Sequence, residues 1–258
     1  MRLHYHKLGH GPNILLAFHG IGQDGVSCFK TFEETLGQHY TIYAFNLFFH
    51  GKSTGINLDS VTKSIWAEII KDFVAENNIT HFDIAGFSMG GRFALATIEA
   101  FPEKIQNAFL IAPDGVSEHA VYFLATRFQL GRRLFKWSMR HSNTFFKVAN
   151  ALKSIGLLND SLVRFTRNVL DTPEKRQTVY KSWTAFRPLR FNIPAVYKLA
   201  KENNIRIFLI TGRFDKLLKM GAVKPLSRLL PEKQNVILKS GHSQLVAQTG
   251  VWICTLFE

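Results

Sequence analysis

A serine flanked by glycines lies where an apolar strand runs directly into a helix. The stretch FDIAGFSMGGRFALATIEA reads as an apolar strand through Ala85, a glycine-rich turn and an amphipathic helix, and residues 86–90 form the pattern Gly-Phe-Ser-Met-Gly. In a G-x-S-x-G nucleophile elbow the serine sits on a strained turn, and side chains at the glycine positions would collide with the strand and the helix. Such a turn exposes Ser88 Oγ at the carboxyl edge of a sheet, at a helix N-terminus that favours negative charge. A serine that only caps the helix is the competing interpretation.

A nucleophilic serine needs a base and an acid that orients the base, and two later strands end near suitable residues. The predicted strand Ile205–Thr211 is followed by Asp215, and the predicted strand Asn235–Lys239 is followed by His242. The carboxyl ends of parallel strands collect ligand groups at one edge of a sheet. Each residue alone has an ordinary explanation, as a capping aspartate or a surface histidine, but the order Ser, Asp, His matches a catalytic triad on an α/β sheet. We therefore predict Ser88, Asp215 and His242 as the catalytic residues.

Negative charge that develops on a substrate oxygen needs N–H donors. One donor is predicted at Met89, the residue after the serine, and the other in the loop after the strand Ile14–Phe18. In that loop Gly20 allows the backbone to turn, and the Ile21 N–H is the expected donor. His19 is interpreted as a hydrogen-bonding residue that orders the loop rather than as a catalytic group.

Two further patterns compete with these assignments. Asp114 follows the strand predicted at Ala108–Ile111 and is a candidate for the acid, but a Pro-Asp-Gly turn accounts for an aspartate there. Residues 20–25 match G-x-G-x-x-G, a dinucleotide fingerprint that expects an acid about 20 residues further on, where this chain has Asn46. A dinucleotide site also leaves the predicted triad unexplained. No organic cofactor is therefore expected. No metal is expected either, because His4 and His6 lack a third ligand nearby.

Strand-like and helix-like stretches alternate along most of the chain. The predicted strands are Leu3–Lys7, Ile14–Phe18, Tyr40–Leu47, Phe82–Ala85, Ala108–Ile111, Ile205–Thr211 and Asn235–Lys239, and the predicted helices include Val26–Leu36, Ser60–Asn77, Gly91–Ala100 and Gly221–Leu230. This alternation predicts an α/β fold with a mostly parallel, doubly wound sheet. From about residue 117 to 203 the strand pattern stops and Phe and Leu recur at helical spacing. We predict a core of residues 1–113 and 204–258 and an inserted helical cap of residues 114–203.

Together these motifs resemble the α/β-hydrolase superfamily, in the capped subgroup that contains esterases, lipases and C–C bond hydrolases. The resemblance covers nearly the whole chain, from His19 and Gly20 through residues 86–90 and Asp215 to His242. It implies an α/β-hydrolase fold with a helical lid. Two departures stand out: the family often has an acid at the start of D-x-x-G-x-G-x-S, where this chain has Asn46, and the short N-terminal region predicts a reduced leading hairpin.

The chain is basic, and the excess charge is concentrated in the predicted cap. The sequence has 32 Lys+Arg and 19 Asp+Glu, a net charge of +13, and residues 114–190 contain 14 of the former and 5 of the latter, a net of +9. A solvated helix face, a membrane-surface helix and a site for an anionic ligand each explain such a segment. No nucleic-acid-binding motif accompanies it, so no nucleic acid partner is expected. The phenylalanine-rich cap predicts a small-molecule substrate with an apolar acyl or aromatic group, and the net charge of +9 predicts an anionic group nearby.

These features predict a serine hydrolase that cleaves an ester, a thioester or a similar acyl bond through an acyl-enzyme. The alternatives are a C–C bond hydrolase or lyase with the same triad and a non-catalytic binding or scaffold protein that retains the fold. Two cysteines form no disulfide framework, no apolar run reaches 18 residues, and the N-terminus lacks the apolar run of a signal peptide. A cytoplasmic location is therefore expected, with peripheral membrane contact through the basic cap as one interpretation of its charge.

Overall fold

Seven strands form one sheet in the computed structural model, which describes residues 1–53, 58–118, 120–154, 160–218 and 220–257. The strands are β1 (Tyr5–Leu8), β2 (Asn13–Phe18), β3 (Tyr40–Phe45), β4 (Phe82–Phe87), β5 (Ile105–Ile111), β6 (Arg206–Gly212) and β7 (Asn235–Leu238). Their order across the sheet is β1-β3-β2-β4-β5-β6-β7, and only β1 runs antiparallel to its neighbour. The predicted mostly parallel α/β sheet is confirmed, and a single strand precedes β2 at the antiparallel edge.

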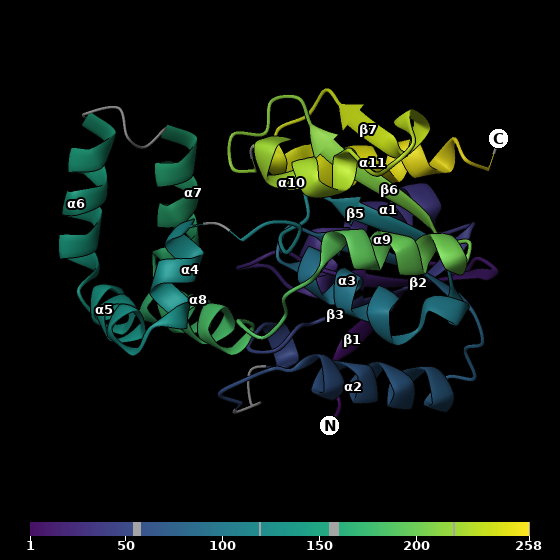
Figure 1. The fold of residues 1–258 in the computed structure, drawn as a ribbon, viewed down its shortest axis with the longest axis horizontal. Helices are drawn as coiled ribbons and strands as arrows, with labels where there is room; N and C mark the ends of the chain where they lie inside the picture. The colour runs from purple at the N-terminus through teal and green to yellow at the C-terminus, as the bar shows by residue number, and fades with distance from the viewer. Residues whose placement is uncertain (54–57, 119, 155–159, 219, 258) are drawn as a thin grey trace.

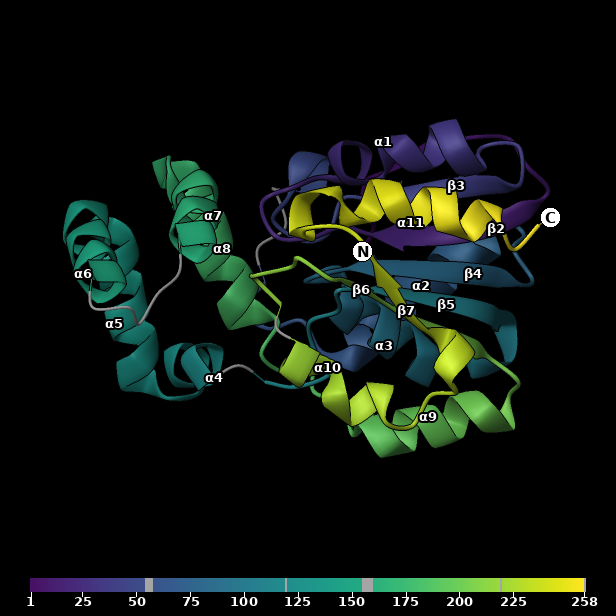
Figure 2. The same ribbon diagram turned by 90° about the horizontal axis from the view of Figure 1, so that it is seen from above.

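Helices cover both faces of this sheet, as in a doubly wound fold (Figures 1 and 2). The helices around the sheet are α1 (Gly25–Leu36), α2 (Lys63–Glu76), α3 (Gly90–Ala100), α9 (Ile193–Glu202), α10 (Met220–Ser227) and α11 (Leu245–Cys254). Helices α1 and α11 pack on one face through Phe29, Phe32 and Leu245, whereas Trp66 of α2 and Phe93 of α3 are buried in the core on the other face. Strands that are buried on both faces explain why the sequence shows continuous apolar runs.

The carboxyl ends of the central strands β4, β5 and β6 determine where the predicted site residues lie. The pattern predicted a strand that ends at Ala85, but β4 continues to Phe87, so the elbow serine follows the strand with no intervening loop. Parallel pairing aligns Phe87 with Ile111 and Ile111 with Ile210. The carboxyl ends of β4, β5 and β6 therefore meet at one edge, where the segments that follow them can approach one another.

In the described residues between β5 and α9, five helices form a separate layer that projects from one end of the sheet (Figures 1 and 2). They are α4 (Ala120–Arg127), α5 (Gln129–Arg140), α6 (Ser142–Ser154), α7 (Asp160–Leu170) and α8 (Pro173–Ala185). Their own buried cluster contains Met139, Leu170 and Val179, and Ile21 of the core packs against it. We call α4–α8 the cap from here on, because it contacts the core near the edge that carries the predicted site.

The predicted cap of residues 114–203 also includes α9, which packs differently. Ile193, Val196 and Ala200 of α9 belong to the buried core cluster on one face of the sheet. The division of the chain into domains remains a prediction, but α9 contributes to the core layer. No helix in the described ranges is long and apolar enough to cross a membrane. Both cysteines, buried Cys28 and half-buried Cys254, are free thiols.

Candidate active site

Ser88 occupies the tight turn between β4 and α3. Its φ of 49° lies in the left-handed region that residues other than glycine seldom adopt. The strained turn is stabilised by backbone hydrogen bonds: the Ser88 N–H donates to the carbonyl of Ile111 at 2.9 Å, and the Ser88 carbonyl accepts from the N–H groups of Gly91 at 2.9 Å and Asp114 at 2.8 Å. An observed strained residue at the carboxyl edge of a sheet is a marker of a functional position.

The glycines around Ser88 are required by close backbone approaches. A Cβ at Gly90 would lie 1.9 Å from the carbonyl oxygen of Phe18, and a Cβ at Gly86 would lie 2.7 Å from the carbonyl oxygen of Gly90. Both distances are far below van der Waals contact. The predicted reason for glycine at these positions is therefore confirmed, and the close packing places the first turn of α3 directly against the end of β2.

Asp215 and His242 come together at the same edge. His242 Nδ1 lies 2.6 Å from Asp215 Oδ2. The second carboxylate oxygen, Oδ1, accepts hydrogen bonds from the N–H groups of Leu217 at 2.8 Å and Leu218 at 3.0 Å. The loops that carry the pair are tied together, because the Phe214 N–H donates to the Ser240 carbonyl at 3.0 Å.

The protonation states of this pair follow from its surroundings. Burial of Asp215 disfavours its ionised form, but the hydrogen bond from His242 and the amides of Leu218 and Leu217 outweigh burial and lower the pKa of Asp215 below its ordinary value. An ionised carboxylate only accepts hydrogen bonds, so His242 Nδ1 must be the donor. In the neutral imidazole this leaves the other ring nitrogen, Nε2, as the acceptor.

Phe87, the residue before Ser88 in the elbow, contacts this pair, whereas Ser88 is not bonded to it. The ring of Phe87 packs against the ring of His242 with centroids 4.8 Å apart. Within the described part of the chain, the Ser88 hydroxyl makes no hydrogen bond. Asp215 and His242 are therefore in direct contact, and the elbow contacts His242 through Phe87. No hydrogen bond joins Ser88 to His242. Such bonds are often long or absent until substrate binds.

The loop after β2 carries the predicted donor Ile21. The N–H groups of Ile21 and Met89 form no hydrogen bond with any residue that the structure describes. The loop lies against the elbow, since a Cβ at Gly20 would come within 3.0 Å of the Phe87 ring. His19 orders this loop as predicted: its Nδ1 lies 2.7 Å from the carbonyl oxygen of Gly20, and its Nε2 accepts from the Leu47 N–H at 3.0 Å.

A second buried histidine, His50, supports the same loop and was not anticipated from the sequence. Its Nδ1 donates to the Phe48 carbonyl at 2.8 Å, and its Nε2 accepts from the Gly22 N–H at 3.4 Å. Burial lowers the pKa of His50 to about 4, and it lowers the pKa of His19 well below the ordinary value. Both imidazoles are therefore neutral at neutral pH, and each can donate through one nitrogen and accept through the other.

Asn46 and Asp114 have structural partners that account for them. Asn46 Oδ1 accepts from the Gly25 N–H at 2.9 Å, at the start of α1, so it binds the loop of the G-x-G-x-x-G sequence to β3. The carboxylate of Asp114 is bound by Arg92 of α3. Asp215, not Asp114, is the acid that contacts the histidine.

The cap reaches the site through α7. The ring of Phe165 lies edge-on to His242 with centroids 6.3 Å apart. One turn further along the helix, Val169 is within 3.5 Å of the position that a Cβ on Gly22 would occupy. Apolar side chains of the cap thus face both the histidine and the loop after β2. The sequence showed a phenylalanine-rich cap but not which of its residues face the site.

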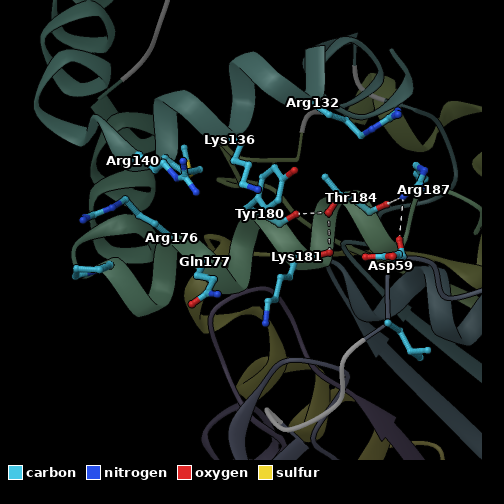
Figure 3. Close-up of a pocket in the computed structure, with 13 residues that line it drawn as sticks. Asp59, Arg132, Lys136, Arg140, Arg176, Gln177, Tyr180, Lys181, Thr184 and Arg187 are labelled. Carbon is cyan, nitrogen blue, oxygen red and sulfur yellow. Dashed lines mark hydrogen bonds between the residues drawn. The ribbon is translucent and has the colours of Figure 1, made fainter. Parts of the chain in front are cut away.

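A separate cavity of about 860 Å³ lies between the cap helices α5 and α8 and the Leu58–Asp59 segment of the core (Figure 3). The basic residues that line it are Arg132, Lys136, Arg140, Arg176, Lys181 and Arg187. None of the three predicted catalytic residues lines this cavity. In the described ranges no three His, Cys, Asp or Glu side chains gather as a metal site.

Comparison with known proteins agrees with this architecture. The family model of the alpha/beta hydrolase fold matches residues 13–247, so the chain belongs to this family. A Mycoplasma genitalium protein named as an esterase/lipase is 21% identical over 81% of this chain and 70% of its own length. The pimeloyl-acyl-carrier-protein methyl ester esterase of Nitrosomonas europaea is 23% identical over 95% of this chain and 94% of its own length. A thermophilic esterase structure from Thermogutta terrifontis superposes with a TM-score of 0.67 at 18% identity, over 99% of this chain and 91% of that one.

Proposed function

We propose that the protein is a serine hydrolase that cleaves a carboxylic ester or a similar acyl bond. The observation that carries this proposal is the 2.6 Å contact between His242 Nδ1 and Asp215 Oδ2 beside Ser88 in its strained elbow. The family match supports a hydrolase, and the names of the two relatives support an ester as the substrate bond. A scaffold that does not catalyse would need none of these three side chains.

In the proposed mechanism, His242 Nε2 removes the proton of Ser88 as Oγ attacks the substrate carbonyl carbon. The N–H groups of Ile21 and Met89, which have no partner among the described residues, donate to the oxyanion. The imidazolium then gives its proton to the leaving alcohol, and an acyl-enzyme remains on Ser88. Water, deprotonated by His242, then attacks the acyl carbon, and His242 returns the proton to Ser88 Oγ as the bond to the acyl group breaks and the acid is released. Asp215 fixes the ring and stabilises the imidazolium.

The cap supports the choice of an apolar acyl or aromatic group. The side chains of Phe165 and Val169 face the histidine and the donor loop, where the acyl part of a bound ester would lie. An apolar group placed there removes its own surface and that of these side chains from water. No metal or organic cofactor has a role in this mechanism.

The experiment is labelling by a fluorophosphonate followed by identification of the modified peptide. The expected label is on Ser88 alone, and Ser88→Ala abolishes both labelling and hydrolysis of a p-nitrophenyl ester. Ser243→Ala is the matched control, because this exposed serine follows His242 in the chain and its side chain makes no hydrogen bond in the described structure. Ester turnover that survives Ser88→Ala contradicts the proposal. Labelling without ester turnover, together with cleavage of a vinylogous diketone, assigns the same residues to C–C bond cleavage instead.

A further inference from the structure

Helix α5 presents a stripe of large apolar side chains to solvent. Leu130, Leu134 and Trp137 follow one another at intervals of four and three residues, so they lie on one face of the helix. Leu130 is 76% exposed, Leu134 is 63% exposed and Trp137 is 47% exposed. An amphipathic helix that only needed to pack in the cap would not carry them.

The packing face of α5 lies elsewhere on the helix. Met139 is buried in the cap cluster and Phe135 packs against it, so these residues fasten α5 to the rest of the cap. Gly131 allows α4 to approach closely, because a Cβ there would lie 2.0 Å from the carbonyl oxygen of Leu124. The exposed stripe therefore takes no part in the buried cluster of the cap, and the helix that carries it is held in place by packing on its other faces.

Two further large apolar side chains are exposed on α4 and at its junction with α5. Leu124 and Phe128 are also mostly exposed. We define the α4–α5 patch as Leu124, Phe128, Leu130, Leu134 and Trp137.

The patch is flanked by cations. Arg133, Lys136 and Arg140 project from the sector of α5 beside the stripe, and residues 120–140 contain five Lys or Arg and no Asp or Glu. Arg127 is neutralised by Glu118 at 2.6 Å, whereas no ion pair forms at the three α5 cations within the described structure. Lys136 and Arg140 also line the basic cavity (Figure 3). An apolar stripe beside a cationic sector is the arrangement of a helix that lies in the plane of a membrane interface.

From this arrangement we infer that the α4–α5 patch docks the protein on a lipid surface that contains anionic headgroups. The leucines and Trp137 enter the boundary between headgroups and acyl chains, and the α5 cations contact the headgroups. A second copy of the chain is a poorer occupant, because a two-fold contact would bring the same unpaired cations face to face. The inference is independent of the catalytic assignment.

Vesicle sedimentation tests the inference with the full chain. The protein is expected to sediment with vesicles of equal phosphatidylcholine and phosphatidylglycerol and to remain in solution with phosphatidylcholine alone. Leu134→Glu should weaken binding about 10- to 100-fold, the effect of withholding one large apolar side chain. The double variant Arg133→Gln, Arg140→Gln should weaken it about 30-fold, from two lost contacts with anionic lipid.

Matched controls separate docking from general effects of charge and exposure. Val251→Glu on α11 places the same charge at a side chain that is 59% exposed on another part of the molecule, and it should bind vesicles as the parent does. Lys71→Gln with Lys201→Gln removes the same charge from exposed positions outside the cap and should change binding little. Vesicles should shift tryptophan emission to shorter wavelength in the parent and not in Trp137→Phe.

Three results would overturn the inference. The first is absence of sedimentation with either type of vesicle. The second is equal weakening by Leu134→Glu and Val251→Glu. The third is a dimer in analytical ultracentrifugation without lipid that Leu134→Glu converts to monomer, which assigns the patch to a second copy. Circular dichroism and thermal unfolding of each variant establish that it is folded.

Discussion

The guanidinium of Arg92 binds both carboxylate oxygens of Asp114, with Nε 2.7 Å from Oδ2 and Nη2 3.2 Å from Oδ1. The Arg92 side chain is 3% exposed. Its Nη1 donates to the Leu189 carbonyl at 3.0 Å, and its Cζ lies over the Tyr122 ring, 4.3 Å from the ring centroid. Arg92 therefore joins α3 to three other parts of the chain. Asp114 lies between β5 and the cap, Tyr122 lies on α4, and Leu189 lies between α8 and α9. Asp114 neutralises this buried cation, which is a structural role.

The two aspartates should consequently respond in opposite ways to the same substitution. Asp215→Asn replaces the acceptor at His242 Nδ1 with an amide that favours the wrong tautomer, and a loss of about 10⁴ in kcat is expected. Asp114→Asn should retain most of kcat but lower the free energy of unfolding, because it leaves Arg92 without its counter-ion. Steady-state kinetics and urea unfolding on both variants check this. A larger kcat loss in Asp114→Asn would transfer the orienting role to Asp114.

Replacement by alanine should have opposite effects on stability at Gly90 in the elbow and at Gly221 on α10. Gly90→Ala puts a Cβ 1.9 Å from a backbone oxygen of β2 that cannot move without disturbing the sheet, so we expect a loss of about 3 kcal/mol or more in unfolding free energy. Gly221→Ala, on α10, meets no atom within 4 Å and should stabilise the protein by about 0.5–1 kcal/mol, since alanine loses less backbone entropy in a helix. Urea unfolding of both variants measures the contrast. Equal effects would mean that the elbow relaxes to accept a side chain.

How far the sequence predicts this site depends on the range of the interactions involved. The elbow is specified locally: a buried strand, two obligatory glycines and a helix leave few conformations for Ser88. Asp215 and His242 were predictable because both follow strands of a parallel sheet, whose carboxyl ends must share an edge. His19 was predictable as a loop-ordering residue because it immediately precedes a glycine turn.

Other contacts depend on how distant segments pack, and no local pattern encodes them. Arg92 lies inside a helix like any surface arginine, and its burial follows only from the cap segments that close over α3. His50 belongs to a loop whose path is fixed by η1 (Gly51–Ser53) and by contact with Gly22. Phe165 is one of many cap phenylalanines. The cap helices carry apolar residues on several faces, so their spacing alone did not indicate which face meets the core.

Buried His50 predicts a dependence of stability on pH. Its pKa is about 4 in the folded protein and near 6.5 when it is exposed. Between these values the unfolded chain holds a proton that the folded protein excludes, so the free energy of unfolding falls as the pH drops from about 6.5 to about 4. The loss from this residue is on the order of 3 kcal/mol. His19, with its pKa lowered well below the ordinary value, acts in the same direction.

Unfolding in urea at several pH values between 4 and 7 measures this slope. His50→Gln should flatten it, because the amide does not titrate, even if the variant is less stable at every pH. The matched control is His10→Gln, which removes an exposed histidine on the first loop and should leave the slope as it is in the parent. An unchanged slope in His50→Gln would show that other groups dominate the acid response.

The charge of the cap leads to the last prediction, which rests on the proposed ester hydrolysis. If the net +9 of residues 114–190 attracts anionic substrates, the attraction is Coulombic and salt must screen it. The Debye length falls from about 30 Å at 0.01 M to about 8 Å at 0.15 M. Over this range kcat/KM for an anionic ester should fall, whereas a neutral ester of equal chain length should show a nearly constant value.

Variants locate the source of this effect. Lys136→Gln with Lys181→Gln removes two cations that line the basic cavity, one on α5 and one on α8, and should reduce the salt dependence for the anionic ester. Lys71→Gln with Lys201→Gln changes the net charge by the same amount outside the cap and should reduce the salt dependence for the anionic ester less. Because serine chemistry and apolar packing are common to both esters, the difference between their salt curves isolates the charge. Parallel curves in the parent protein would show that the cationic cap plays no part in substrate capture, and its charge would then be free to serve the lipid contact alone.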